Sequence, residues 1–176
     1  MDKLLEEARK YVGIESTDEV ACDPVERGAV RRYSQAIMHD DIAFHDAECA
    51  GRFGGPVAPP LFPLHMFRRP FGTPDVLTER ADDPDFDGVI ATSAQGLPEI
   101  APFRGLAVLN GGMEIEMRRY ALHGEHVRLR SRYVDVTSRE SRRGRIYLVV
   151  IETEYRTGEG DLLMTARRTQ IRRNAS

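Results

Sequence analysis

The sequence has little cysteine, no long apolar run and no apolar leader. Its 176 residues include two cysteines, Cys22 and Cys49, which are too few for a disulfide framework and read as buried thiols in a reducing compartment. No window approaches the roughly 20 apolar residues that span a bilayer. Residues 1–7 lack the apolar core of a signal peptide. These absences predict a soluble cytoplasmic protein.

An excess of positive charge is also lacking. The net charge of −3 argues against a nucleic-acid binder, because such proteins carry a basic excess. Lys3 and Lys10 are the only lysines, so nearly every basic residue is an arginine, whose planar fork suits phosphate. No His, Cys, Asp and Glu cluster has metal-ligand spacing, and the glycine pairs lack the pattern of a nucleotide loop. We therefore predict no metal and no cofactor.

The first third of the chain has helical signals. Apolar residues at helical spacing predict a short helix over residues 3–12, which Gly13 ends, and residues 14–22 suggest an edge strand. Asp23 can cap a second helix, with Pro24 at its first position and Glu26 completing a capping box. That helix should stop near residue 39.

An apolar segment, Leu61–Phe67, follows two prolines and reads as a buried helix that ends before Pro70. His65 within it is either a hydrogen-bonded core histidine or a ligand. Residues 68–104 are rich in Pro, Asp and Gly without a sustained period, which predicts a long excursion with at most one short helix.

Strands dominate after Gly105. Residues 113–117 and 127–133 alternate between apolar and charged side chains, residues 146–151 are apolar on both faces, and residues 162–171 form a last strand. Helices followed by long antiparallel strands predict the α+β class. The economical packing curls one antiparallel sheet around the central helix at Leu61–Phe67, as a single hot-dog domain over residues 1–176.

Several segments resemble, in order, the N-terminal dehydratase domain of the MaoC-like family. They are Tyr33–Asp46, Gly55–Phe62, Leu109–Glu116, Gly124–Val127, Ile151–Tyr155, Gly160–Leu163 and Arg167–Ile171. The resemblance covers nearly the whole chain. It is shared with the dehydratase region of type I fatty-acid synthases and with mycobacterial hydroxyacyl-ACP dehydratase subunits.

This resemblance implies a hot-dog fold, dimerisation through the sheet, and thioesters of coenzyme A or acyl-carrier protein as ligands. It also implies substrate-binding positions, and a backbone N–H near the start of the central helix that polarises the thioester carbonyl. The implied substrate-binding residues are Tyr33, Phe44, Gly55, Pro56, Val57, Ala58, Pro59 and Phe62.

Active members of the family carry an Asp and a His in the pattern D-x-x-x-x-H, which handle the water and the proton. Aligned without gaps, these two positions fall on His39 and Phe44 here, and the pair is absent. Shifted by one residue, Asp40 and His45 restore the spacing and become the candidate catalytic residues. Either residue could instead belong to a solvated turn.

Two readings of the function follow for an enoyl-CoA hydratase or (3R)-hydroxyacyl dehydratase. The chain is the substrate-binding subunit of a heteromer whose second hot-dog subunit supplies the Asp/His pair, or it is a self-sufficient homodimer that uses Asp40 and His45. A non-catalytic acyl-CoA binding protein and a thioesterase are further alternatives.

Two arginine groups have two readings of their own. They grip the phosphates of coenzyme A or an acidic carrier protein, or they form a solvated strand face paired with glutamates. The groups are Arg139, Arg142, Arg143 and Arg145, and Arg167, Arg168, Arg172 and Arg173.

Overall fold

The computed structural model describes residues 2–44, 46, 51–67, 72–73, 76–84, 96–142 and 144–174. Its helices are α1 (Lys3–Arg9), α2 (Arg27–Ala36) and α3 (Val76–Glu79), with the one-turn 3-10 helices η1 (Ile42–Phe44), η2 (Gly51–Phe53), η3 (Phe62–His65) and η5 (Ala101–Phe103). Its strands are β1 (Glu19–Val20), β2 (Ala107–Met117), β3 (Val127–Ser141), β4 (Gly144–Thr157) and β5 (Leu162–Arg173).

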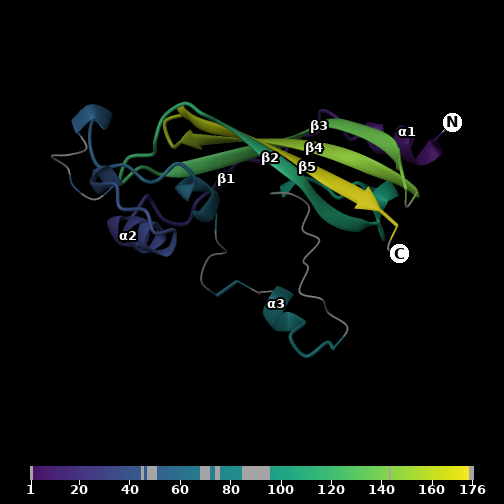
Figure 1. Ribbon diagram of the computed structural model, residues 1–176, viewed down its shortest axis with the longest axis horizontal. Helices are drawn as coiled ribbons and strands as arrows, with labels where there is room; N and C mark the ends of the chain where they lie inside the picture. Colours follow the sequence, from purple (N-terminus) through teal and green to yellow (C-terminus); the bar gives the residue numbers. More distant parts are fainter. Residues whose placement is uncertain are drawn as a thin grey trace.

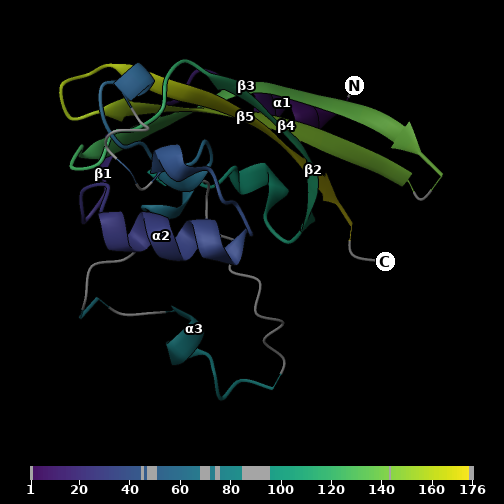
Figure 2. The same cartoon turned by 60° about the vertical axis from the view of Figure 1, so that its left-hand side comes forward.

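The five strands form one antiparallel sheet in the order β1-β3-β4-β5-β2. The sheet arches over α2 and the 3-10 turns at one end, while α1 lies at the other end (Figure 1; Figure 2). This arrangement confirms the α+β class. None of the helices in the described ranges is long and apolar enough to cross a membrane.

Alternation along the strands gives the sheet an inner and an outer face. Inner-face residues pack into two buried clusters, which we call the α2 cluster and the α1 cluster after the helices that cover them. The α2 cluster contains Val25, Val30, Phe44, Val57, Ala58, Phe62, Ala121, Val127, Leu129, Tyr155, Leu163, Met164 and Ala166. The α1 cluster contains Ala8, Leu97, Ile100, Phe103, Tyr133, Val136, Tyr147, Val149 and Ile151.

The centre of β4 differs from the sequence prediction. Residues 146–151 were expected to be covered on both faces, but only the inner residues Tyr147, Val149 and Ile151 are buried. The outer residues between them are half-buried because no layer of the described structure covers that face. β4 is central in the sheet, yet the sheet is covered on one side.

Helix α1 begins where predicted and ends at Arg9, three residues before the predicted end, while α2 begins later than predicted. Asp2 caps α1 by accepting a hydrogen bond from the Leu5 N–H at 3.2 Å. The expected cap of α2, Asp23, lies four residues before the helix starts at Arg27. The Val25 backbone instead pairs with residues 124 and 125, donating to the Glu125 carbonyl and accepting from the Gly124 N–H, each at 2.9 Å. This long-range pairing keeps residues 23–26 extended.

The prediction of a buried helix over Leu61–Phe67 is mostly wrong. Only the single 3-10 turn η3 forms there, and Leu61 is 41% exposed while Phe62 is buried. Pro59, Pro60 and Pro63 have no backbone N–H, so few i to i−4 hydrogen bonds could form in this segment. The sheet therefore arches over α2 together with η3, rather than over one long central helix.

Two smaller expectations also need correction. The last part of the excursion predicted over residues 68–104 belongs to the core. Leu97, Ile100 and Phe103 are buried in the α1 cluster, and η5 forms in the same segment. Cys22 is exposed rather than buried, and Cys49 lies outside the described residues. The helix α3 is the one short helix expected in the excursion.

Candidate functional site

The turn after α2 places the candidate acid–base residues, and its backbone is unusual. Met38 has a φ of 54°, in the left-handed region that favours glycine. The His39 N–H donates to the Ser34 carbonyl at 2.8 Å, and the Met38 N–H donates to the Gln35 carbonyl at 3.2 Å. These two bonds form a Schellman cap with methionine at the position where glycine is usual. The cap turns the chain sharply before Asp40.

The structure does not test the predicted pair of Asp40 and His45. Asp40 is exposed in this turn, and His45 lies outside the described residues. The neighbouring Asp41 lies 3.9 Å from Arg52, and its N–H donates to Nδ1 of His39 at 3.2 Å. The pair therefore stays a prediction.

Phe44, the other candidate in this turn, is a core residue. It is buried in the α2 cluster, and its ring meets that of His39 at 4.8 Å between centroids. In the ungapped alignment these two rings occupy the family's Asp and His positions. A phenyl ring there cannot accept or donate a proton.

The Gly55–Pro59 loop is held against the segment before β3. The Ala58 N–H donates to the Ala121 carbonyl at 2.8 Å, and the His123 N–H donates to the Pro56 carbonyl at 3.0 Å. Gly55 has a φ of 155°, and a Cβ built there would lie 3.6 Å from Leu122. Val57, Ala58 and Pro59 are buried as a result. The loop is therefore held in place by backbone hydrogen bonds and packing.

A cavity of about 420 Å³ lies between α2 and η3. The Tyr33 ring packs edge-on against Phe62 at 5.5 Å and tilts over His65 at 4.9 Å. Burial raises the pKa of the Tyr33 phenol, which therefore stays protonated. The cavity is lined by Asp23, Pro24, Glu26, Ala29, Arg32, Tyr33, Phe62, His65 and Met66.

The structure thus brings together five of the predicted substrate-binding residues. Phe44, Val57, Ala58 and Phe62 share the α2 cluster, and Tyr33 packs against it. Gly55, Pro56 and Pro59 belong to the loop that carries Val57 and Ala58. Asp40 lies on the exposed turn and is not among the residues that line this cavity.

Three residues at the cavity were given other roles by sequence reasoning. Asp23 and Glu26 were read as the cap and capping box of α2, and their carboxylates line the cavity because the helix starts at Arg27. His65 was predicted to be either a core histidine or a ligand, and the structure exposes it at the cavity rather than burying it. The sequence signal for His65 was present: three prolines nearby disfavour a buried helix. Within the described ranges no three metal-ligating side chains gather.

The carboxylates, imidazole and phenol around this cavity can hold and move protons, and its apolar wall can hold a hydrocarbon group. Glu125 lies behind the site as a structural residue. Its carboxylate accepts hydrogen bonds from Arg119 at 2.7 and 3.0 Å and from the Leu122 N–H at 2.8 Å. The hydrogen bonds that Arg119 donates to Glu125 raise the pKa of the Arg119 guanidinium and outweigh burial, which would lower it.

Comparison with known proteins identifies the family of this chain. Residues 10–166 match the family described as "FAS1-like, dehydratase domain region". No protein among the curated sequences matches the chain.

Several solved structures are similar in fold. The ChsH1-ChsH2 complex from Mycobacterium tuberculosis has 17% sequence identity and a TM-score of 0.69, over 99% of this chain and 91% of that one. The MaoC-like dehydratase from Rhodospirillum rubrum has 17% identity and a TM-score of 0.57, over 94% of each chain. The C-terminally truncated HadBC (3R-hydroxyacyl-ACP dehydratase) complex from M. tuberculosis has 19% identity and a TM-score of 0.54, over 92% and 98%. These likenesses confirm the hot-dog fold.

Proposed function

The chain belongs to the FAS1-like dehydratase-region family of MaoC-like hot-dog proteins, and we propose from this that it binds an acyl thioester. The thioester is one of coenzyme A or of acyl-carrier protein. The reaction served is hydration of an enoyl thioester or dehydration of a (3R)-3-hydroxyacyl thioester. This chain acts as the substrate-binding subunit, and a second hot-dog subunit supplies the Asp/His pair.

The cavity beside Tyr33 supports the binding role. Phe62 and Met66 give it an apolar wall, and the fixed Gly55–Pro59 loop leads into it. The Leu61 N–H donates to no acceptor in the part of the chain that the structure describes, and it directly precedes η3. We assign this N–H as the candidate donor to the thioester carbonyl, since prolines 59 and 60 have none to offer.

One observation carries the assignment to a binding subunit. Phe44 holds the family's histidine position in the ungapped alignment, and it is 4% exposed within the apolar α2 cluster. A general acid must reach the substrate and release a proton at that point. A buried phenylalanine does neither, so the proton must come from elsewhere.

The free edge of the sheet supports a hot-dog partner. β2 pairs only with β5, which leaves one side of an eleven-residue strand without a neighbour in the described chain. Leu109, Met113 and Met117 on this strand are 40%, 48% and 36% exposed. A long edge strand with exposed apolar residues is suited to edge-to-edge pairing. Solved complexes of similar fold, ChsH1-ChsH2 and HadBC, contain more than one kind of subunit.

The experiment compares the purified chain with a reconstituted pair on crotonyl-CoA. The second component is a MaoC-like hot-dog chain that carries an intact D-x-x-x-x-H. We expect the chain alone to be nearly inactive and the pair to hydrate crotonyl-CoA. A partner with its histidine replaced by alanine should remove the activity of the pair.

Robust turnover by the chain alone would contradict this assignment and favour the homodimer. In that case Asp40→Asn and His45→Ala should each abolish turnover, with Asp41→Asn as the matched control in the same turn. Saturable acyl-CoA binding without turnover in any pairing would leave a non-catalytic binding protein. Product analysis separates hydrolysis of the thioester from hydration.

A further inference from the structure

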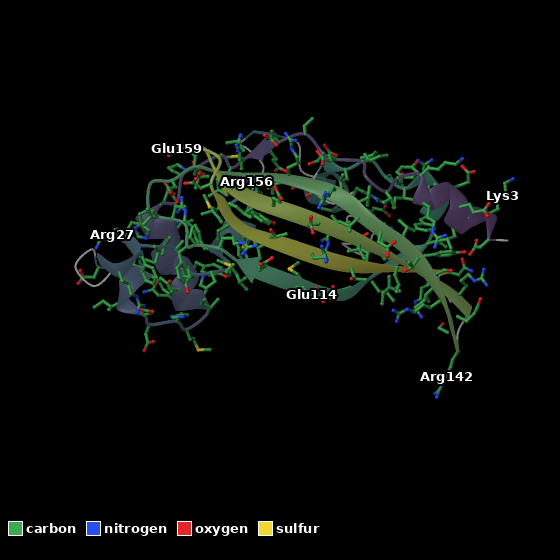
Figure 3. All side chains as sticks on the ribbon, turned by 90° about the horizontal axis from the view of Figure 1, so that it is seen from above. Lys3, Arg27, Glu114, Arg142, Arg156 and Glu159 are labelled. Atoms are coloured by element: carbon green, nitrogen blue, oxygen red, sulfur yellow. The ribbon has the colours of Figure 1, made fainter. Side chains whose placement is uncertain are left out.

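The outer face of the sheet pairs its arginines with carboxylates. Arg130 donates to Asp18 at 2.7 Å, and Arg156 lies 2.9 Å from Glu154. Arg132 and Arg167 each lie 2.6 Å from the carboxylate of Glu152. Figure 3 views this face, with Arg156 near one end and Glu114 on the edge strand β2. Of the two arginine groups singled out in the sequence, this confirms the paired strand face for Arg167.

The inner face of β5 is different. Arg168, Gln170 and Arg172 alternate with outer-face residues along this strand, so their side chains share the inner face. Arg168 has Ile151 and Met113 as its cross-strand neighbours, and Arg172 has Tyr147 and Val108. Gln170 is 7% exposed, and both arginines are half-buried. We call these three residues the inner strip.

No carboxylate of the described residues forms an ion pair with either arginine of the inner strip. Arg172 donates from Nη2 to Oε1 of Gln170 at 3.0 Å, and its Nε is buried without a hydrogen-bond partner. The negative charge of Glu99 acts on Arg172 through space, but Glu99 itself forms an ion pair with Arg104 at 2.9 Å. Burial lowers the pKa of the Arg172 guanidinium, and the charge of Arg168 acts in the same direction.

Two half-buried cations without a carboxylate are costly. The free-energy cost of removing a guanidinium from water is offset only when an anion and well-placed hydrogen-bond acceptors replace the water. An arginine fork offers paired donors that match a carboxylate or a phosphate. The geometry of the inner strip is therefore that of an anion site.

The inner strip continues the inner face of β5 from the α2 cluster, and Phe62 of that cluster lines the proposed substrate cavity. Ala166 belongs to the α2 cluster with Phe62, and Arg168 is the next inner-face residue along β5, about 7 Å further on. Ile151 on β4 and Tyr133 on β3, both of the α1 cluster, lie level with Arg168 across the sheet. An acyl chain that starts at Phe62 and follows the inner face of β5 meets Arg168 next.

We propose that Arg168 and Arg172 bind a carboxylate at the far end of the acyl chain, so that the substrate is a thioester of a dicarboxylic acid. This inference rests on the proposed function, because the same cavity holds the acyl group. The inner-face position favours the acyl carboxylate over the carrier's phosphates. The phosphates belong to the bulky end of the ligand, which stays outside the fold.

The test is calorimetric titration of the full chain, and of its complex with a partner, with two thioesters of equal chain length. Glutaryl-CoA carries the second carboxylate, valeryl-CoA does not, and coenzyme A alone reports the carrier's phosphates. The variants are Arg168→Gln and Arg172→Gln. Arg167→Gln is the matched control, because it is the adjacent arginine of β5 on the outer face.

We expect the wild-type chain to bind glutaryl-CoA about tenfold or more tightly than valeryl-CoA, as for a hydrogen-bonded charge. Each inner-strip variant should lose about tenfold for glutaryl-CoA while valeryl-CoA changes by less than about twofold. Arg167→Gln should keep the wild-type ratio. Circular dichroism and the melting temperature establish that each variant is folded.

Four results would overturn the inference. Equal wild-type affinity for the two thioesters would reject the carboxylate site while leaving the proposed function intact. Equal losses for both thioesters and for coenzyme A would assign the arginines to the carrier's phosphates. Weaker subunit association without any change in thioester binding would assign them to carboxylates of a partner. Absence of binding by either thioester, in the chain and in its complex, would reject the proposed function and this inference with it.

Discussion

Glu152 and Arg167 face each other across β4 and β5, and Oε2 of Glu152 accepts a hydrogen bond of 2.6 Å from Nη2 of Arg167. Arg132 binds the other oxygen of the same carboxylate at 2.6 Å from β3. One side chain that is 8% exposed thus joins three neighbouring strands on the outer face. The interaction holds the middle of the sheet together on the face that no helix among the described residues covers.

Glu152 should make stability depend on acid pH. Burial would raise the pKa of its carboxyl, but the hydrogen bonds from Arg167 and Arg132 outweigh burial and lower it. A pKa that is lower in the folded state stabilises the fold above the unfolded value of 4.5, and this contribution disappears as the pH falls through the folded pKa. Glu152→Gln should cost about 1 kcal/mol at pH 7 and progressively less below 4.5. Urea unfolding of both proteins at several pH values measures the difference, and a constant difference down to pH 3 would be incompatible with this role of Glu152.

Gly111 should not tolerate a methyl group. A Cβ at this bulge would lie 3.0 Å from both the carbonyl oxygen and Cγ2 of Thr169, and 3.1 Å from Ile171. Gly111→Ala should therefore lower the free energy of unfolding by about 1 to 3 kcal/mol through overpacking between β2 and β5. The control is Gly28→Ala in α2, where the nearest atom is 3.5 Å away. That variant should gain about 0.5 to 1 kcal/mol of stability. Equal effects of the two variants would exclude the steric explanation.

Met38 should be improved by glycine. Its left-handed backbone costs an L-residue roughly 1 to 2 kcal/mol, and its side chain is 90% exposed, so little packing is lost on removal. Met38→Gly should raise the free energy of unfolding by about 0.5 to 1 kcal/mol after the larger freedom of glycine in the unfolded chain is counted. Gln35→Gly, in the last turn of α2, should instead lower it by about 1 kcal/mol. A destabilised Met38→Gly would show that the Met38 side chain has a stabilising contact.

Met113 should contribute to association through the β2 edge. A lysine on an edge strand opposes edge-to-edge pairing, so Met113→Lys should shift the protein toward the monomer in light scattering coupled to size exclusion. Ile37→Lys is the control, because Ile37 at the end of α2 is 47% exposed and Met113 is 48% exposed. Unchanged mass for Met113→Lys would place the subunit contact elsewhere.

The strands were the most predictable part of the fold. Alternation at residues 113–117 and 127–133 depends only on local sequence, and both segments lie in strands with the expected pairing direction. The late start of α2 could not be read locally. It depends on backbone hydrogen bonds from Val25 to residues about a hundred positions away in sequence. The α1 cluster did leave a signal that was missed, the spacing of three between Leu97, Ile100 and Phe103.

The candidate site was predicted in part. Tyr33 and Phe62 at the cavity were found because a resemblance pointed to them, and Phe44 joins Phe62 in the α2 cluster. Asp23 and Glu26 were not found, since a capping box explains the same two carboxylates with purely local geometry. The inner strip could not be found either. Deciding which arginines of β5 face inward requires the strand register, and consecutive Arg167 and Arg168 look alike in sequence.

The order β1-β3-β4-β5-β2 places the first long strand to be synthesised beside the last. β2 ends at Met117, yet its partner β5 begins at Leu162, so β2 has no neighbour while β3 and β4 are being translated. Sheets closed by such distant pairing fold slowly, because loop-closure entropy is spent before the contacts form. Nascent chains that lack the C-terminal strand will therefore expose β2, and chaperone binding should concentrate on this interval of synthesis.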